Sequence, residues 1–412
     1  MNQSEVTKSS PPFRGLCKYD VKKLFQDINT PAYVIDEVML HKNGKILREI
    51  QERTGCKILL AQKAFSNYDV YGILGKYLAG TEASGLYEAR LGAEEMPEGE
   101  VHVFCGAYRE DEFLELLNYA DHIVFNSPAQ LKKFGGQAKQ AGKSVGIRIN
   151  PEHSTGGEHE IYDPCAKGSR LGITKEQWEK YMTPELISLL DGIHFHTLCE
   201  QDSDALEETL TAVEEKFGTY LKQMKWINFG GGHHITKPGY GIERLEQCIK
   251  KIQERYQVEV YLEPGEACAL NAGYLVTQVL DIVENGDVKN LIIDASAACH
   301  MPDVIEMPYT PPLYCAEAGN EGVHVYRLAG PTCLAGDVIG DYSFEEKLQE
   351  GDMLLFGDMA IYTTCKNNTF NGMPLPNIWK RSLNGELIQL TDFGYGDFKM
   401  RLGSSRTMDY ML

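Results

Sequence analysis

The chain has 412 residues, 43% of them hydrophobic, and 40 Lys and Arg against 59 Asp and Glu residues give a formal net charge of −19. This length exceeds one ordinary hydrophobic core and predicts two domains, while the acidic surface excludes nucleic acid and anionic membranes as expected partners. No apolar run approaches the roughly 20 residues of a membrane span. The eleven cysteines have neither paired nor CxxC spacing, and the sequence has no N-terminal apolar signal segment, so we expect a reduced, cytoplasmic setting.

Short apolar segments alternate with longer helix-like stretches through the middle of the chain. Eight segments are typical of buried strands: "KILLA" (57–61), "AGTEAS" (79–84), "VHVFC" (101–105), "HIVF" (122–125), "VGIRI" (145–149), "GIHFH" (192–196), "WINF" (226–229) and "VEVYLE" (258–263). Eight such units in about 210 residues favour a closed parallel α/β barrel. An open doubly wound sheet is the structural alternative.

The pattern changes after about residue 270 to strands with few helices between them, such as "GYLVTQVLDIVE" and "GDMLLFGDM", which predicts a mainly-β domain. The early segment "PAYVID" (31–36) precedes the barrel, and we expect it to pair with this β domain. The expected divisions are therefore an N-terminal segment at 1–38, a barrel at 39–270 and a β domain at 271–412.

The carboxyl ends of the predicted barrel strands carry polar residues or glycines. They are Lys63, Glu82, Ser84, Asn126, Arg148, Asn150, His194, His196, Gly230, Gly231, Gly232 and Glu263. A single charge at a strand end is often only solvated. Because all strand ends of a parallel barrel meet at one mouth, we interpret these residues as one shared site.

Three features at this mouth match the requirements of pyridoxal phosphate (PLP). The glycines of "FGGGHH" (229–234) offer backbone N–H groups to a phosphate, although a plain strand-to-helix turn also explains them. Lys63 could form a Schiff base, and Glu263 could keep a pyridinium nitrogen protonated; the alternatives are a surface lysine and an unrelated salt bridge. The three features adjoin only if the sheet closes.

A series of motifs carries a family resemblance from about residue 30 to the C terminus. They are "AQKAFS", "EASGLYEARLG", "RINP", "GSRLGI", "HFHTLCE", "NFGGGHHIT", "EPGEA", "GPTCLAGD" and "GDMAIYT". In this order they resemble the fold type III PLP-dependent decarboxylases, the alanine-racemase-like group that includes ornithine, arginine and diaminopimelate decarboxylases. The resemblance implies a PLP-binding barrel, a C-terminal mainly-β domain and a homodimer with shared active sites.

The resemblance also implies roles for individual residues. Lys63 matches the Schiff-base lysine, and Cys333 matches a cysteine that works across the dimer interface, so these two are the predicted catalytic residues. Outside "GPTC", Cys333 would be interpreted as a buried structural cysteine. The predicted cofactor-binding residues are Lys63, Glu82, Arg148, His196, Gly231, Gly232, Glu263, Gly265 and Tyr362.

Within this family, "HTLCEQ", "GGGHHIT", "HMPDVIEMPY" and "GPTCLAGD" are most similar to members that act on a carboxytriamine, a small cationic amino acid. Ornithine and diaminopimelate decarboxylases place an acid directly after the cysteine, where this chain has Leu334, and many relatives read "EPGR" where this chain has Glu266. A cationic tail needs acidic partners. The candidates are Asp337, Glu266, Asp303, Glu306 and Glu200.

Other functions stay open at this point. Ornithine or diaminopimelate decarboxylase and a racemase are alternatives within the family. His194 and His196 lie on one strand face, as in metal-dependent barrel amidohydrolases, with Glu263 or His233 as further ligands. Such enzymes need neither Lys63 nor the glycines, so no metal is predicted. Non-catalytic PLP-binding relatives lack the lysine, the cysteine or the β domain, and a PLP-dependent carboxy-lyase is therefore expected.

Overall fold

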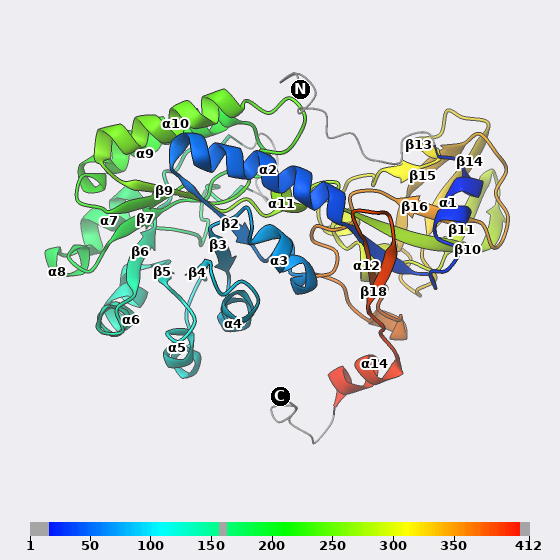
Figure 1. Cartoon of the computed structure of the whole chain (residues 1–412), viewed down its shortest axis with the longest axis horizontal. Helices are drawn as coiled ribbons and strands as arrows, with labels where there is room; N and C mark the ends of the chain where they lie inside the picture. The colour runs from blue at the N-terminus through cyan, green and yellow to red at the C-terminus, as the bar shows by residue number, and fades with distance from the viewer. Residues whose placement is uncertain (1–15, 156–162, 404–412) are drawn as a thin grey trace. The chain divides into compact units, whose positions relative to one another are not determined.

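The computed structural model describes residues 16–155 and 163–403, which fall into two units (Figure 1). One unit holds Leu40–Ala269, and the other holds the described residues up to Met39 together with those from Leu270 onward. The sequence-based divisions were placed after residues 38 and 270. The predicted fold class, an eight-stranded α/β barrel with a mainly-β domain, is confirmed.

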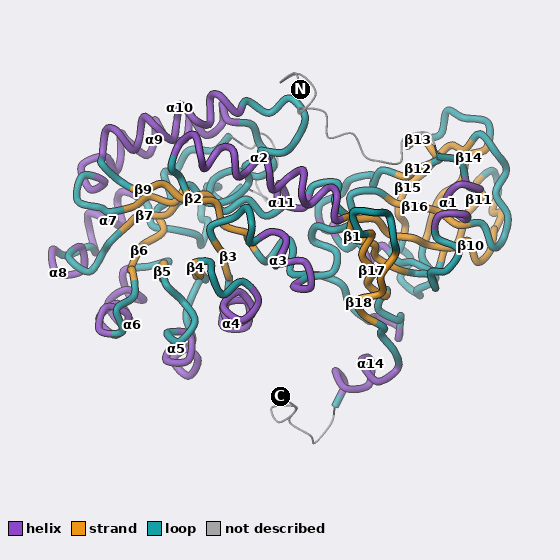
Figure 2. The backbone as a smooth tube through the Cα atoms, in the orientation of Figure 1, coloured by secondary structure: helices purple, strands orange, loops and turns teal. Residues whose placement is uncertain are grey.

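Eight parallel strands form the barrel of the first unit (Figure 2). They are β2 (Lys57–Ala61), β3 (Gly80–Ala83), β4 (Glu100–Phe104), β5 (His122–Phe125), β6 (Ser144–Arg148), β7 (Gly192–His194), β8 (Trp226–Asn228) and β9 (Glu259–Leu262). Each strand pairs with the next one along the chain, and β2 pairs with β9 through Lys57↔Tyr261 and Ile58↔Leu262. This last pairing closes the barrel and excludes the open sheet.

Helices connect the barrel strands and cover the outside of the sheet (Figure 1). They are α2 (Glu37–Thr54), η1 (Tyr68–Val70), α3 (Tyr71–Leu74), α4 (Leu86–Glu95), α5 (Glu110–Leu116), α6 (Pro128–Gln140), α7 (Lys175–Tyr181), α8 (Pro184–Ile187), α9 (Ser203–Leu221), α10 (Ile242–Tyr256) and α11 (Glu266–Ala269). In α10, buried Leu245, Ile249 and Ile252 recur every three or four residues, the spacing of one helix face. Ser127 caps the amino-terminal end of α6, because its hydroxyl accepts a hydrogen bond from the backbone N–H of Gln130.

The second unit is a ten-stranded mixed sheet with few helices. Its strands are β1 (Ala32–Asp36), β10 (Gly273–Asn285), β11 (Val288–Ile293), β12 (Leu313–Tyr314), β13 (Ala316–Ala318), β14 (His324–Ala329), β15 (Val338–Phe344), β16 (Met353–Phe356), β17 (Asn377–Arg381) and β18 (Leu387–Thr391). Its helices are α1 (Lys18–Leu24), α12 (Ala297–His300), α13 (Asp303–Glu306), η3 (Phe370–Gly372) and α14 (Tyr395–Leu402).

The early segment forms β1, which runs antiparallel to β10 and parallel to β17. Successive residues of a strand face opposite sides of the sheet. Tyr33 of β1 accordingly packs in one hydrophobic cluster with Leu275, and Val34 packs in another with Tyr274. Apolar side chains thus pack against both faces of β1 and stabilise the β domain.

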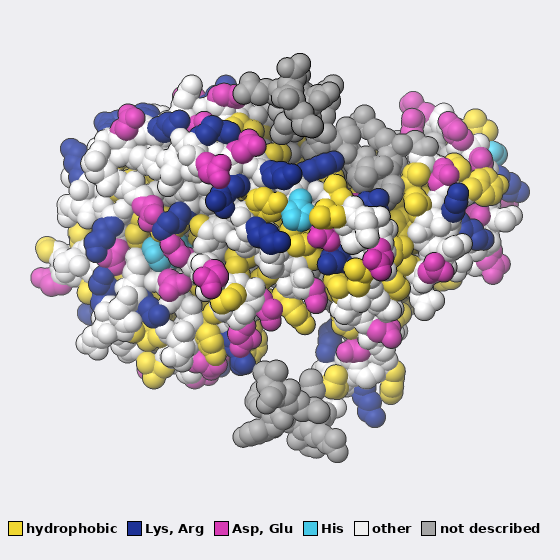
Figure 3. All heavy atoms as spheres, viewed as in Figure 1, with side chains coloured by type: hydrophobic (Ala, Val, Ile, Leu, Met, Phe, Trp, Pro, Cys, Tyr) yellow, Lys and Arg dark blue, Asp and Glu magenta, His cyan; other side chains and the backbone are white. Residues whose placement is uncertain are grey.

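The visible surface in Figure 3 carries acidic and basic side chains interspersed with one another. Among the described residues, no helix combines the length and the apolar character that crossing a membrane requires.

Candidate active site

Lys63 lies just past the end of β2, in a turn that its neighbour Gln62 fixes. The backbone N–H of Gln62 donates to the carbonyl of Glu82 at 3.0 Å, and its side-chain amide donates to the carbonyl of Glu88 at 2.8 Å. The hydroxyl of Tyr71 donates to the amide oxygen of Gln62 at 3.0 Å. The backbone of the turn is therefore held firmly, while the Lys63 side chain stays 35% exposed.

Glu263 directly follows β9 and is buried with a partner on each carboxylate oxygen. Asn228 donates from Nδ2 to Oε1 at 2.5 Å, and His194 contacts Oε2 through Nε2 at 3.0 Å. Burial opposes ionisation, but the adjacent His194 and the nearby Lys63 outweigh it and lower the pKa of Glu263 to about 2. Glu263 is therefore a fixed negative charge inside the barrel.

Glu82, at the end of β3, is equally buried, but its pKa is shifted in the opposite direction. Burial raises the pKa of its carboxyl to about 8, with Lys63 opposing the shift and Glu263 adding to it. The Nζ of Lys63 lies 4.0 Å from Oε2, and among the residues that the structure describes no group donates a hydrogen bond to this oxygen. Two carboxyl groups at one mouth thus differ in charge because only Glu263 has close hydrogen-bond donors.

The glycine segment after β8 turns tightly against neighbouring loops. The N–H of Gly230 donates to Oδ1 of Asn228 at 2.8 Å, which starts the turn. A Cβ at Gly231 would lie 2.8 Å from the carbonyl oxygen of Glu263, and one at Gly232, where φ is +81°, only 2.0 Å from that of Leu198. Within the described residues, the backbone N–H groups of Gly231 and Gly232 have no acceptor. This is the arrangement that an anion-binding turn requires.

The next glycine on the predicted phosphate side, Gly265, packs against the lysine turn. A Cβ at this position would lie 2.6 Å from the Cβ of Ala64, the residue after Lys63. Any side chain here would displace the lysine turn, so a packing requirement accompanies the predicted role at the phosphate.

Arg148 and His196 are both buried or nearly so at the same end of the barrel. Nη2 of Arg148 donates to the carbonyl of His196 at 3.0 Å, and its guanidinium lies over the ring of Phe104 at 4.6 Å. Burial lowers the pKa of Arg148 to about 10. Burial, followed by the charge of Lys63, holds the pKa of His196 well below its ordinary value, so this imidazole is neutral at neutral pH.

Two of the predicted substrate acids, Glu200 and Glu266, come together around His234. Nε2 of His234 lies 3.3 Å from Oε1 of Glu266, and one donor atom from each of the three residues lies within 4.8 Å of the others. Burial works against a charged imidazole, but Glu266 raises the pKa of His234. The sequence analysis did not assign His234 to the site, although it directly follows His233 in the glycine motif.

The three predicted acids of the β domain have partners within that domain. Asp337 is buried, and its carboxylate accepts hydrogen bonds from the hydroxyls of Ser296 at 2.9 Å and Thr332 at 2.6 Å. Asp303 and Glu306 both form ion pairs with Lys366. Asp337 therefore braces the turn that carries Cys333, and the other two acids neutralise a lysine.

Cys333 is exposed, and its position depends on a residue that the sequence analysis did not single out. Its backbone N–H donates to Oδ1 of Asn371 at 2.8 Å, and Asn371 itself has a left-handed backbone with φ +58°. Tyr362 in the same domain is also left-handed, with φ +54°. No sequence pattern connects Asn371 with the "GPTC" motif, so only the fold reveals the contact.

The remaining polar strand ends have structural partners. Asn126 accepts a hydrogen bond from the N–H of Gly172 at 2.7 Å and donates to the carbonyl of Arg170 at 2.9 Å. Asn150 accepts one from the N–H of Glu152 at 2.8 Å. Asn126 thus links the end of β5 to the loop after β6, and Asn150 closes the loop that follows its own strand.

The alternative interpretation was a metal site built on His194 and His196. In the described part of the chain, these two residues do not belong to any group of potential ligands whose donor atoms lie close together. His194 is instead engaged with Glu263. The sequence analysis counted His194 among the polar strand ends but gave it a specific role only in the metal alternative, and it gave Asn228 no role. A polar residue in an apolar strand, as in "WINF", is the signal that could have identified Asn228.

Comparison with known proteins shows which family the chain belongs to. Residues 32–360 match the family described as pyridoxal-dependent decarboxylase, C-terminal sheet domain. The chain is 44% identical over 388 residues to carboxynorspermidine/carboxyspermidine decarboxylase of Campylobacter jejuni, covering 92% of this chain and 99% of the relative. It is 40% identical over 375 residues to carboxyaminopropylagmatine decarboxylase of Synechocystis sp., covering 91% and 95%.

A solved structure agrees with these relatives. The crystal structure of carboxynorspermidine decarboxylase complexed with norspermidine from Campylobacter jejuni matches with a TM-score of 0.83 at 42% identity, covering 91% of this chain and all of that one. The chain belongs to the pyridoxal-dependent decarboxylases, and the resemblance to this group is confirmed. It is a decarboxylase of this family, not a metal-dependent hydrolase.

The raised pKa of Glu82 predicts how stability depends on pH. The folded chain holds this proton up to a pKa of about 8, whereas the unfolded chain releases it near the ordinary value of about 4.3. The stabilisation is complete below the lower value and is lost as the pH rises through the upper one. In thermal unfolding of the cofactor-free protein, Glu82→Gln should therefore gain stability over the wild type with rising pH, by at most about 1.4 kcal/mol per unit.

The control for this measurement is Glu95→Gln, an exposed acid at the end of α4. It measures the effect of the same substitution where the side chain lies in water, and the pH dependence of Glu82→Gln is compared with it. A difference from the wild type that stays constant with pH for Glu82→Gln would show that Glu82 ionises at its ordinary pKa and would contradict the assignment.

Proposed function

We propose that the chain is a PLP-dependent carboxy-lyase that converts carboxynorspermidine or carboxyspermidine into norspermidine or spermidine and CO2, a step of polyamine biosynthesis. The observation that carries this proposal is the 44% identity, over 92% of the chain, to an enzyme with this activity in its name. The similar solved structure complexed with norspermidine supports the same substrate class. We further propose that the enzyme works in the cytoplasm as a homodimer with shared active sites.

The residues at the barrel mouth fit pyridoxal phosphate. The backbone N–H groups of Gly231 and Gly232 have no acceptor among the described residues and could bind a phosphate, while the neighbouring loops leave no space for a Cβ at either position. Glu263 is ionised and buried, as a partner for a protonated ring nitrogen must be. His196 is neutral and suits a position against an aromatic ring, and the amine of Lys63 is within reach of solvent.

When bound, the cofactor supplies an electron sink for the electrons released on loss of CO2. Lys63 is proposed to anchor the cofactor covalently and to give way to the substrate amine. Glu263, fixed by Asn228 and His194, holds a proton at the ring nitrogen and so keeps the sink effective. Cys333, from the partner subunit, is proposed to return a proton to the carbon that has lost CO2.

The substrate's cationic tail is proposed to lie against Glu266 and Glu200. These acids lie with His234 beside the glycine turn, whereas Leu334 occupies the position where related decarboxylases have an acid. Charge-assisted hydrogen bonds to such carboxylates contribute roughly 1.5–3 kcal/mol each. Asp337, Asp303 and Glu306 stay predictions as tail partners, although their present hydrogen bonds and ion pairs favour roles within the β domain.

A second candidate substrate is carboxyaminopropylagmatine, because the Synechocystis relative of that name is 40% identical over 91% of the chain. Its tail ends in a guanidinium group, which binds a carboxylate through two parallel hydrogen bonds. Glu200 and Glu266 could bind the tail of either substrate, so the rates of CO2 release must decide between the two substrates.

Release of CO2 from a panel of substrates tests the proposed function. The panel holds the two carboxytriamines, carboxyaminopropylagmatine, ornithine, lysine, arginine and diaminopimelate. We expect kcat/KM for a carboxytriamine to exceed that for ornithine by at least about a hundredfold, because a shorter tail leaves buried polar groups unpaired. A ratio near one would contradict the assignment, and a preference for carboxyaminopropylagmatine would select the second candidate.

Glu266→Gln tests the proposed tail site. Loss of one charge-assisted contact should lower kcat/KM for the carboxytriamine by about ten- to a hundredfold, mostly through KM, if the contact is the same in ground and transition states. The control is Glu243→Gln, an exposed acid in the first turn of α10, which should leave both constants unchanged. Wild-type kinetics in Glu266→Gln would remove this residue from the tail site.

Mixing two inactive variants tests the proposed sharing of active sites. Lys63→Ala removes the covalent anchor and the visible absorption of the cofactor, and Cys333→Ala removes the proposed proton donor. A hybrid dimer contains one site with neither substitution, so full random exchange should restore up to roughly a quarter of wild-type activity. Subunit exchange is first verified by pull-down through a tag, and verified hybrids without activity would show that each site lies within one chain.

A further inference from the structure

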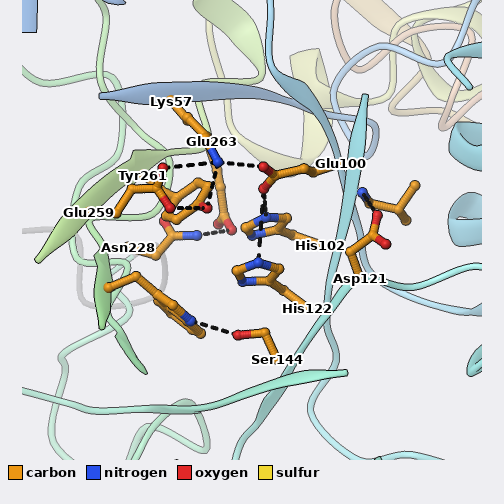
Figure 4. A network of polar contacts seen from close by, with 12 residues as sticks. Lys57, Glu100, His102, Asp121, His122, Ser144, Asn228, Glu259, Tyr261 and Glu263 are labelled. Carbon is orange, nitrogen blue, oxygen red and sulfur yellow. Dashed lines mark hydrogen bonds and ion pairs between the residues drawn. The ribbon is translucent and has the colours of Figure 1, made fainter. Parts of the chain in front are cut away.

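A second polar cluster lies inside the barrel at the opposite end from the candidate active site, where the strands begin (Figure 4). Glu100 is the first residue of β4, His102 lies two residues further on, and His122 is the first residue of β5. We call these three residues the lower cluster. Barrel chemistry normally takes place at the carboxyl ends of the strands, so the decarboxylation site does not account for polar groups here.

The three side chains of the lower cluster direct one atom each toward a common point. Oε2 of Glu100 lies 3.0 Å from Nε2 of His102 and 3.9 Å from Nε2 of His122, and all three atoms lie within 4.8 Å of one another. Ligands bound to one tetrahedral zinc ion at about 2.0–2.1 Å stand about 3.3 Å apart. The two imidazole rings are stacked with their centroids 3.9 Å apart. Small rotations of the two rings relative to each other would bring the three ligand atoms to about 3.3 Å from one another.

Nδ1 of His122 is buried without a hydrogen-bond partner in the described residues, and the side chain is only 13% exposed. Nδ1 of the fully buried His102 is unpartnered as well. Buried polar atoms in native proteins nearly always have partners. Each of these two imidazoles thus has an unpartnered Nδ1 and an Nε2 beside the same carboxylate, so hydrogen bonds within the core do not fully account for the pair.

Neighbouring side chains hold the carboxylate in place and leave one oxygen for the cluster (Figure 4). Nζ of Lys57 contacts Oε1 of Glu100 at 2.5 Å and Oε1 of Glu259 at 2.9 Å. The hydroxyl of Tyr261 donates to Oε2 of Glu259 at 2.6 Å. The side chains of Lys57 and Glu100 are 33% and 30% exposed, so an ion can reach the cluster from solvent.

We propose that Glu100, His102 and His122 bind a divalent first-row transition-metal ion, Zn2+ by preference, at the amino-terminal end of the barrel. Two histidines and one carboxylate are a known ligand set for such ions, with water in the open position. The ion would join β4 to β5 and stabilise the barrel without taking part in decarboxylation. This inference does not depend on the substrate assignment.

Titration of the chelator-treated holoprotein with Co2+ tests the proposal, because tetrahedral Co2+ absorbs at longer wavelengths than the cofactor. We expect one ion per chain, displaced by Zn2+. His122→Phe keeps an aromatic ring in the stack but removes a ligand, and Glu100→Gln keeps the shape of its side chain. Loss of a second-shell partner already costs about ten- to a hundredfold in affinity, so each variant should lose more than a hundredfold.

Two controls keep the result specific. Ser144→Ala alters the same end of the barrel without removing a ligand, and Glu200→Gln alters the other cluster of potential ligands near the glycine turn. Both should bind Co2+ as the wild type does, and circular dichroism verifies that every variant is folded. Failure of the folded wild type to bind Co2+ or Zn2+, retention of binding in a folded His122→Phe or Glu100→Gln variant, or loss of binding in Glu200→Gln would each overturn the proposal.

Discussion

The pairing of β2 with β9 is the contact on which the active site depends. It joins Lys57 and Ile58 to Tyr261 and Leu262, residues about two hundred positions further along the chain, and so closes the barrel. Lys63 and Glu263 follow these two strands and therefore lie at neighbouring positions of one mouth. In an open sheet the same strands would be opposite edges, and the lysine would have neither the carboxylate nor the glycine turn beside it.

The closed barrel also explains how two acids with the same side chain acquire different charges. Both are removed from water, which by itself favours the neutral form. Glu263 has Asn228 and His194 as hydrogen-bond partners and stays ionised, whereas Glu82 has Lys63 at the longer distance of 4.0 Å and retains its proton. A permanent anion and a protonated acid thus lie near one amine, because their surroundings shift the two pKa values in opposite directions.

The sequence predicts the barrel well because its signals are local. Apolar strands separated by helical stretches repeat eight times, and the residues just past them, such as Lys63 and Glu263, could be identified as a site from position alone. The contacts of Asn228 and His194 with Glu263, and that of Asn371 with Cys333, join residues distant in sequence and have no local signal. The strands β17 and β18 were not predicted, because their side chains are mostly partly exposed and lack a clear apolar alternation.

The central claim is that Glu263, charged and fixed by its two partners, controls the protonation of the cofactor ring. The most direct measurement is the 15N chemical shift of the ring nitrogen in enzyme reconstituted with 15N-labelled pyridoxal phosphate. The wild type should show a protonated nitrogen across neutral and mildly alkaline pH, because the pKa of Glu263 is lowered to about 2, and Glu263→Gln should show an unprotonated one. An unprotonated nitrogen in the wild type, or the same shift in both proteins, would contradict the account.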